Sequence, residues 1–247
     1  MIIRKIILRA DLILFWVFLI TLSTLAQQKN FKHFYTELHL GIKYNFGPTE
    51  DQAEIVGGFD SLYYDNFQHF FPGFKTSVPV ELVFGYNYDN SVHLESTLGY
   101  YKLDMALIQN FNRSEYPFLI ADMVSMKVSV LFRISDEDID SSFGISTGMS
   151  FGAVFPFSNE INKETKSYFG IKDFQQSLEL FFEVNAIGYL PLNYDGLYLT
   201  AGASFTLPWL IGSIGEIEMQ SGSSYSITRD DVLLHSISGF VGVGYRL

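Results

Sequence analysis

Ionisable side chains recur at alternate positions in several apolar segments of this chain. Two close pairs, Glu37 with His39 and His93 with Glu95, each have a spacing of two residues. In a β-strand this spacing places both side chains on one face, where the carboxylate could orient the imidazole for metal binding or base catalysis. The five histidines are scattered along the chain, so we expect neither a metal site nor a cofactor.

The same alternate positions collect a larger set of residues with both charge signs. These are Glu37, His39, Lys43, Glu81, His93, Glu95, Lys127, Arg133, Glu179, Glu183 and Arg246. We predict that they line the interior of a β-barrel as a network of ion pairs and hydrogen bonds, because buried charges must be paired or hydrated. A catalytic or proton-relay role is the alternative for the same set.

A lipid hydrolase would need a histidine and a serine side by side in space. His235 and Ser236 are adjacent in the sequence, but neighbouring residues of a strand point to opposite faces, and Ser238 lies on the face of Ser236. The chain also lacks a Gly-rich phosphate loop, a nucleophile elbow and a zinc-protease motif. The sequence therefore predicts a protein that is not an enzyme, with a lipid-modifying enzyme as the alternative.

The elements that would position these residues are strands. No segment after residue 26 is apolar over the roughly 18 residues that a membrane-spanning helix needs. Instead, apolar and polar residues alternate, as in 143–155, where Phe143 and Ile145 oppose Gly144 and Ser146. The segments with this pattern are 35–46, 80–88, 92–101, 124–134, 143–155, 178–186, 197–207 and 233–247.

The connections between these segments alternate between long and short. The long ones are 47–79, 102–117, 156–173 and 208–231, and the short ones are 89–90, 135–142 and 189–196. This rhythm, together with apolar faces free of charge and aromatic residues near strand ends, is typical of outer-membrane barrels. We predict an all-β fold, an eight-stranded antiparallel up-and-down transmembrane β-barrel with short periplasmic turns and long extracellular loops. A soluble β-barrel is the architectural alternative.

Composition agrees with a membrane barrel. Charged residues make up 17% of the 247 residues, below the roughly 25% usual in soluble domains, and aromatic residues also reach 17%. The net charge of -11 argues against nucleic-acid binding, which needs clustered basic residues. Because an eight-stranded barrel has room only for its own side chains, a narrow channel is a weaker alternative. Outer-membrane lipid is an expected partner.

Residues 1–26 have the order of a signal peptide: a basic start, an apolar run, and small residues before the cleavage site. Thr24 and Ala26 suit signal peptidase, which would leave residues 27–247 as the outer-membrane barrel domain. An N-terminal membrane anchor is the alternative, but the apolar run of about 15 residues is shorter than the roughly 20 that a spanning helix needs.

The first long connection is unusually rich in aromatic residues. Those that we expect at the surface are Tyr63, Tyr64, Phe67, Phe70, Phe71 and Phe74. They could pack over the barrel mouth as a lid or form a contact surface for an envelope protein or a glycan. The apolar segment 211–219 in the last long connection could pack with them.

At the C-terminus, Gly242, Tyr245 and Leu247 are similar to the signal by which the barrel-assembly machinery recognises a last strand, with Leu247 in place of the usual Phe. The chain resembles small outer-membrane barrels of the OmpA and OmpX type, and more closely the PorT-like barrels of Bacteroidota, whose signal peptides resemble the Leu25-Ala26-Gln27 exit. The resemblance implies an accessory role in protein secretion. The pattern itself favours a non-enzymatic barrel whose extracellular loops bind, shield or assist another envelope or surface component.

Overall fold

The computed structural model describes ten ranges of the chain. They are 34–45, 53–57, 70–88, 91–109, 114–134, 143–176, 178–192, 194–208, 213–229 and 236–247. The signal peptide predicted over residues 1–26, together with Tyr63, Tyr64, Phe67 and His235, lies outside these ranges.

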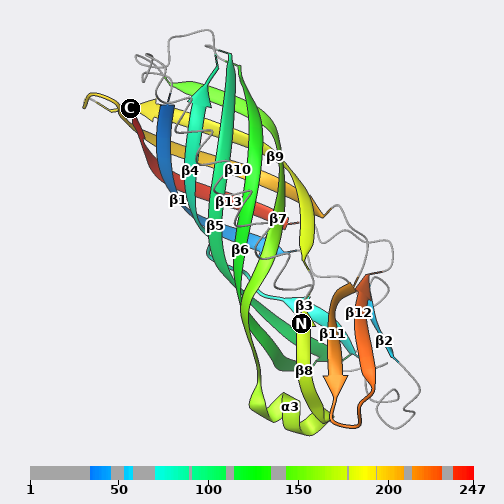
Figure 1. Ribbon diagram of the computed structural model, residues 1–247. Coiled ribbons are helices and arrows are strands. Elements are labelled where there is room, and N and C mark those ends of the chain that lie inside the picture. The colour runs from blue at the N-terminus through cyan, green and yellow to red at the C-terminus, as the bar shows by residue number, and fades with distance from the viewer. Residues whose placement is uncertain are drawn as a thin grey trace.

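Eight long strands close into a barrel in which successive strands are neighbours (Figure 1). They are β1 (Phe34–Asn45), β4 (Val80–Asn87), β5 (Val92–Gln109), β6 (Glu115–Arg133), β7 (Gly144–Ile161), β9 (Glu179–Pro191), β10 (Leu197–Pro208) and β13 (Ser236–Arg246). The ring order is β5-β4-β1-β13-β10-β9-β7-β6, and β6 pairs with β5 to close it. The predicted eight-stranded, up-and-down transmembrane barrel is therefore confirmed.

The two faces of the barrel wall differ as the alternation predicted. Outward side chains are apolar and open, with Leu40, Val128 and Val243 exposing 54%, 53% and 42% of their surface. Inward positions carry buried polar groups such as Glu37 and Ser204. This is the arrangement of a barrel whose outer wall faces lipid, because a closed ring satisfies every backbone group and leaves only side chains to meet the membrane.

One end of the barrel carries the short connections, and we call it the turn end. Here β4 is followed by β5, β6 by β7 and β9 by β10, and the last turn uses Gly196 with φ 74. The start of β1 and the end of β13 meet at this end, where the Leu247 N–H donates to the Phe34 carbonyl at 2.9 Å. Strand β9 continues to Pro191, so the turn predicted at 189–196 is shorter than expected.

At the other end, strands continue where loops were expected. The prediction of a long loop at 102–117 is wrong, because β5 and β6 remain paired from the barrel to Ile108 and Glu115. The alternation continues there with its faces exchanged: Leu103 and Met105 point inward and are buried, whereas Lys102 is exposed. The other long connections also carry regular structure in their described parts.

These extensions and a second sheet form what we call the outer cap, at the lower end of Figure 1. Its second sheet has the order β2-β12-β11-β8. Its elements are β2 (Ala53–Gly57), β3 (Phe70–Phe74), α3 (Lys163–Phe169), β8 (Ile171–Gln176), β11 (Ser213–Met219), β12 (Ser224–Arg229) and the ends of β5, β6 and β7 beyond the barrel. Strand β3 extends the first sheet by pairing with β5.

The outer cap has a hydrophobic core of its own. Met105 and Phe118 from the extended hairpin, Phe174 from β8, Ile217 from β11 and Tyr225 from β12 are all at most 1% exposed. The core also includes Tyr101, Val154 and Phe181, which lie in the barrel strands β5, β7 and β9 next to the cap. The apolar core of the cap therefore continues into this end of the barrel and packs in the manner of a water-soluble domain.

Helix α3 joins β7 to β8 and follows the capping rules of soluble helices. The Asn162 side-chain oxygen accepts hydrogen bonds from the backbone N–H groups of Glu164 and Thr165 at 3.0 and 3.1 Å. Gly170 ends the helix in the left-handed conformation, with φ 67. Among the described residues, no helix is long and apolar enough to cross a bilayer.

Candidate functional site

The ionisable residues singled out in the sequence come together in the barrel interior. Lys127 on β6 lies between two carboxylates from opposite walls, with its Nζ 2.7 Å from Glu183 Oε1 and 3.3 Å from Glu81 Oε1. The Thr206 hydroxyl donates to the other Glu183 oxygen at 3.1 Å. These contacts tie β6, β9, β4 and β10 together across the interior, and they compensate charges that would otherwise be buried alone.

A histidine continues the network toward the turn end. His39 Nε2 is 2.5 Å from Glu37 Oε2, and its Nδ1 is 4.0 Å from Glu81 Oε2. The imidazole is stacked on Phe240, with ring centroids 4.3 Å apart. Gly242 leaves the room for this ring, because a Cβ at that position would lie 2.4 Å from His39 Cδ2. The Glu37–His39 spacing thus does produce a contact on one strand face.

The second pair identified in the sequence behaves differently. The nearest polar partner of His93 Nδ1 is Asn87 Oδ1 at 2.5 Å, while Glu95 accepts the Tyr35 hydroxyl at 2.7 Å. The printed hydrogen bonds of His93 and Glu95 thus go to different residues, Asn87 on β4 and Tyr35 on β1. Within the described residues, no group of three His, Cys, Asp or Glu side chains is arranged to hold a metal ion.

Tyrosine hydroxyls form the next layer toward the turn end. Tyr198 donates to Glu37 Oε1 at 2.7 Å, as Tyr35 does to Glu95. The sequence analysis missed these tyrosines as site residues because it collected only acidic and basic side chains on the inward face. The signal was present in their parity, since Tyr35 and Tyr198 share the inward face with Glu37 and Thr200.

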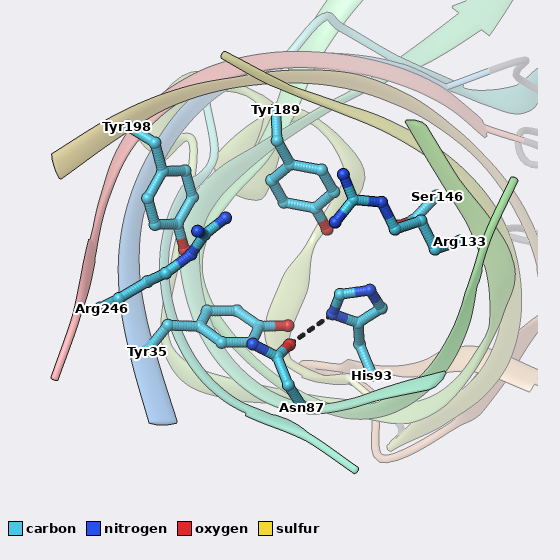
Figure 2. A pocket seen from close by; sticks show the side chains of 8 residues that line it. All are labelled: Tyr35, Asn87, His93, Arg133, Ser146, Tyr189, Tyr198 and Arg246. Atoms are coloured by element: carbon cyan, nitrogen blue, oxygen red, sulfur yellow. Dashed lines mark hydrogen bonds between the residues drawn. The ribbon is translucent and has the colours of Figure 1, made fainter. Parts of the chain in front are cut away.

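A small cavity opens at the turn end, as Figure 2 shows along the barrel. Its lining consists of Tyr35, Asn87, His93, Arg133, Ser146, Tyr189, Tyr198 and Arg246. His93 lies parallel to the ring of Tyr189, with centroids 6.2 Å apart, and the guanidinium carbon of Arg246 is 5.0 Å from the ring centre of Tyr198. The predicted Arg133 and Arg246 thus meet at one site, although they lie in different strands.

The remaining predicted residues lie nearer the outer cap. Lys43 Nζ is 5.0 Å from the ring centre of Tyr101, over its face, and Glu179 is half-buried at the start of β9. A second cavity of about 30 Å³ is lined by Lys43 and Glu81 and by Val154 and Phe181 of the barrel wall. The cavity at the turn end measures about 10 Å³, room for about one water molecule.

These volumes show how the described residues fill the barrel. Paired charges, tyrosines and hydroxyl groups occupy the interior, as in the Ser204–Ser238 contact at 2.8 Å, and the apolar core of the cap follows above them. Ser236 is buried on the inward face, and its sequence neighbour His235 is outside the described ranges. Such an interior can hold fixed charges in place, but it offers little space to a solute.

Three of the six aromatic residues predicted in the first long connection lie in the described ranges, and all three belong to the outer cap. Phe70, Phe71 and Phe74 lie in β3, where Phe71 pairs with Ile108 of β5. The first and last long connections do pair in the backbone, since Tyr225 of β12 pairs with Gly57 of β2. Packing of the segment 211–219 against the first-loop aromatic residues stays a prediction. Whether the aromatic residues act as a lid or as a contact surface stays a prediction.

A groove of about 540 Å³ crosses the surface of the outer cap. It is lined by Lys75, Asp104, Pro117, Phe118, Leu119, Ile120, Glu160, Ile161, Asn162, Lys163 and Glu164. Lys75 Nζ and Asp104 Oδ2 are 3.2 Å apart, and their side chains are 51% and 37% exposed. The groove thus offers both charge signs beside apolar Ile120.

Comparison with known proteins places the fold. No protein-family model and no curated protein matches the chain. The outer membrane protein OprG from Pseudomonas aeruginosa matches with a TM-score of 0.66 at 8% identity, over 87% of this chain and 95% of OprG. The fold is that of a small outer-membrane β-barrel. A major outer membrane protein from Thermus thermophilus matches with a TM-score of 0.48 at 12% identity, over 87% of this chain and 99% of that protein.

In outer-membrane barrels the short turns face the periplasm and the long connections face outward. The turn end, with its arginine cavity, is accordingly the periplasmic end of this fold, and the outer cap is its extracellular end.

Proposed function

We propose that this chain is a non-enzymatic protein of the bacterial outer membrane that acts through its outer cap. The cap would bind, shield or assist another envelope or surface component, either a protein or a glycan. Export through a cleaved signal peptide over residues 1–26 and insertion by the barrel-assembly machinery, with Gly242, Tyr245 and Leu247 as the recognised end, belong to the same proposal.

The proposal rests on a contrast between the barrel interior, which is filled by its own side chains, and the outer cap, which is a folded structure with a packed core. Lys127, Glu81 and Glu183 occupy the middle of the barrel with their own contacts. The strands β5, β6 and β7 continue beyond it and form a packed core with the second sheet. Because rigid strands position surface groups more accurately than free loops do, the cap is suited to present a binding surface.

The groove on the cap is the best candidate for that surface. Its lysines, carboxylates and Asn162 offer donors and acceptors, and Ile120 offers an apolar contact. This mixture suits a polar partner that also buries some apolar area. An accessory role in protein secretion, as the PorT-like resemblance implies, would be one form of this function. The filled interior argues against a narrow channel, and no arrangement of described residues favours a lipid-modifying enzyme.

The test uses two matched charge reversals, each in an exposed Lys–carboxylate pair of the cap. Lys75→Glu alters the groove, whereas Lys172→Glu alters the pair with Glu218 on the second sheet. Tagged wild-type protein and both variants are used for affinity capture from native outer membranes. We expect a specific partner to be kept by Lys172→Glu and lost by Lys75→Glu. Equal capture by all three proteins would contradict the assignment of the groove.

A further inference from the structure

The lipid-facing wall of the barrel contains a concave region that we call the wall hollow. It measures about 540 Å³ and extends across β4, β5, β6 and β7. Its floor follows one row of cross-strand neighbours, Gly85, Glu95, Ser129 and Ser150. The side chains of Glu95, Ser129 and Ser150 are buried inside the barrel. The floor therefore presents backbone to the outside, and the hydrogen-bonding groups of that backbone are already used within the ring of strands.

Two aromatic pairs stand at the ends of the wall hollow, and aliphatic side chains lie between them. The ring centroids of Phe34 and Tyr86 are 4.8 Å apart, and those of Phe151 and Phe182 are 5.3 Å apart. The aliphatic residues between the pairs, such as Val130, are smaller than the rings. Among the outward-facing residues that line the hollow, only Tyr86 carries a hydroxyl, amide or charged group. The hollow therefore suits an apolar occupant.

The wall hollow rises obliquely from the turn end of the barrel. Tyr86 is next to Asn87, the last residue of β4 at the turn end, whereas Phe151 lies seven residues beyond Gly144, the first residue of β7 at that end. Three strand spacings of about 4.8 Å separate β4 from β7, so the floor is about 14 Å long. An acyl chain of one leaflet spans about 15 Å, half of the roughly 30 Å hydrocarbon core. The floor thus has the length of one acyl chain that enters from the periplasmic side.

The surroundings of the wall hollow identify its occupant. The hollow is continuous with the outward wall that faces lipid, and its lower end lies at the periplasmic end of the fold. We propose that the wall hollow is a binding site for one acyl chain of a phospholipid from the periplasmic leaflet.

The concave shape distinguishes this lipid from its neighbours. A chain in the hollow contacts protein on the floor and on both sides, whereas a chain on a convex part of the wall contacts protein on one side, so the dispersion attraction is greater in the hollow. The lipid in the hollow therefore stays bound while the surrounding lipid exchanges. The site depends on the membrane position of the barrel and not on the function proposed for the outer cap.

The test counts the phospholipids that stay on the protein in detergent. The purified protein is folded into vesicles of phosphatidylethanolamine and phosphatidylglycerol, transferred to a mild detergent and measured by native mass spectrometry. We expect a single phospholipid to remain on most wild-type chains. Val130→Trp fills the hollow with an indole ring, and Phe151→Ala removes part of one aromatic end. Each should lower the fraction of lipid-bound chains by about threefold or more, because the acyl chain loses space or contacts.

Matched controls lie on the outward wall away from the hollow. Val243 on β13 is 42% exposed, against 41% for Val130, and Phe205 on β10 is 37% exposed, against 40% for Phe151. Val243→Trp and Phe205→Ala should therefore retain the phospholipid as the wild-type protein does. Heat-modifiable migration in gels checks that each variant is folded.

Absence of retained phospholipid on the wild-type protein would overturn the proposal. So would equal retention by the wild-type protein and the two hollow variants, or an equal loss in all four variants. A lipid-free dimer of wild-type chains that Val130→Trp separates into monomers would also overturn it, because a second copy of this chain would then fill the hollow.

Discussion

Strands β5 and β6 run through two regions with opposite internal order, the barrel and the outer cap. In the barrel, outward Leu98 and Val128 are open while inward Glu95 is buried among polar groups. In the cap, outward Lys102 is exposed while inward Leu103 is buried in an apolar core. The faces of one continuous ladder thus exchange their chemistry near Tyr100.

The polarity of the two strand faces changes because the outer wall is surrounded by lipid in the barrel and by water in the cap. From Val92 to Tyr100, β5 rises about 20 Å at the usual strand spacing and tilt, close to the roughly 25 Å apolar band of outer-membrane barrels. Over this height apolar side chains gain nothing by pointing inward, so the interior can be polar. Above it, water surrounds the strands, and burial of apolar side chains again drives packing. The largest differences in stability between the barrel and the cap should therefore follow from substitutions in the polar interior of one or the apolar core of the other.

Loss of the buried lysine should have the largest effect. Lys127→Met leaves Glu81 and Glu183 without their shared cation, and we expect the free energy of unfolding to fall by about 3–5 kcal/mol. Lys172→Met, which breaks an exposed pair in the cap, should cost less than about 1 kcal/mol. Urea titrations in lipid vesicles, followed by circular dichroism, measure both. Equal stability of the two variants would mean that the barrel network does not stabilise the fold.

A cavity in the cap core should loosen the cap and spare the barrel. Leu107 is fully buried, and Leu107→Ala should cost about 2–5 kcal/mol of local stability. Leu199→Ala on the outward barrel face exchanges side-chain contacts for lipid contacts and should cost less. Limited proteolysis should cut the cap of Leu107→Ala faster, while the barrel keeps its heat-modifiable migration. Simultaneous loss of the barrel would show that the two regions unfold as one unit.

A charge placed on the outward face should locate the boundary between the regions. Val128 and Ile120 lie on the same strand with nearly equal exposure, 53% and 52%, one in the apolar band and one in the cap. Val128→Arg should cost about 2–4 kcal/mol, because it places a charge in lipid, and Ile120→Arg close to zero. Refolding yield and urea titration in vesicles measure the difference. A large penalty at Ile120 would extend the membrane beyond the proposed boundary.

The helix cap should give the smallest effect. Asn162→Ala removes the acceptor for two backbone N–H groups of α3 and should destabilise the cap by about 1 kcal/mol. The exposed neighbour Lys163→Ala is the matched control and should change little. Hydrogen exchange at the N–H groups of Glu164 and Thr165 would detect the loss locally. Unchanged exchange rates would argue that tertiary contacts alone hold this helix.

Much of the barrel was predictable because alternation reports directly on which face meets lipid. The segments 35–46 and 143–155 coincide closely with β1 and β7 within the barrel. The strand extensions were missed because apolar residues were expected only at outward positions. Lys102 lies at an outward position, so it was taken as the start of a loop. The cap strands β2 and β12 could not be paired from the sequence, since they are short and lie in connections far apart along the chain.

In the barrel interior too, some contacts were predictable from the sequence and others were not. Local spacing was enough to place Glu37 beside His39, because a strand has a fixed period of two. The pairing of Lys127 with Glu183, and the meeting of Arg133 with Arg246, depend on strand register and on closure of the ring. By itself, the sequence determined the number of barrel strands and the side that faces lipid, because both follow from local period and polarity. Only the tertiary structure decided which charges meet and where water replaces lipid, because these depend on which distant strands become neighbours.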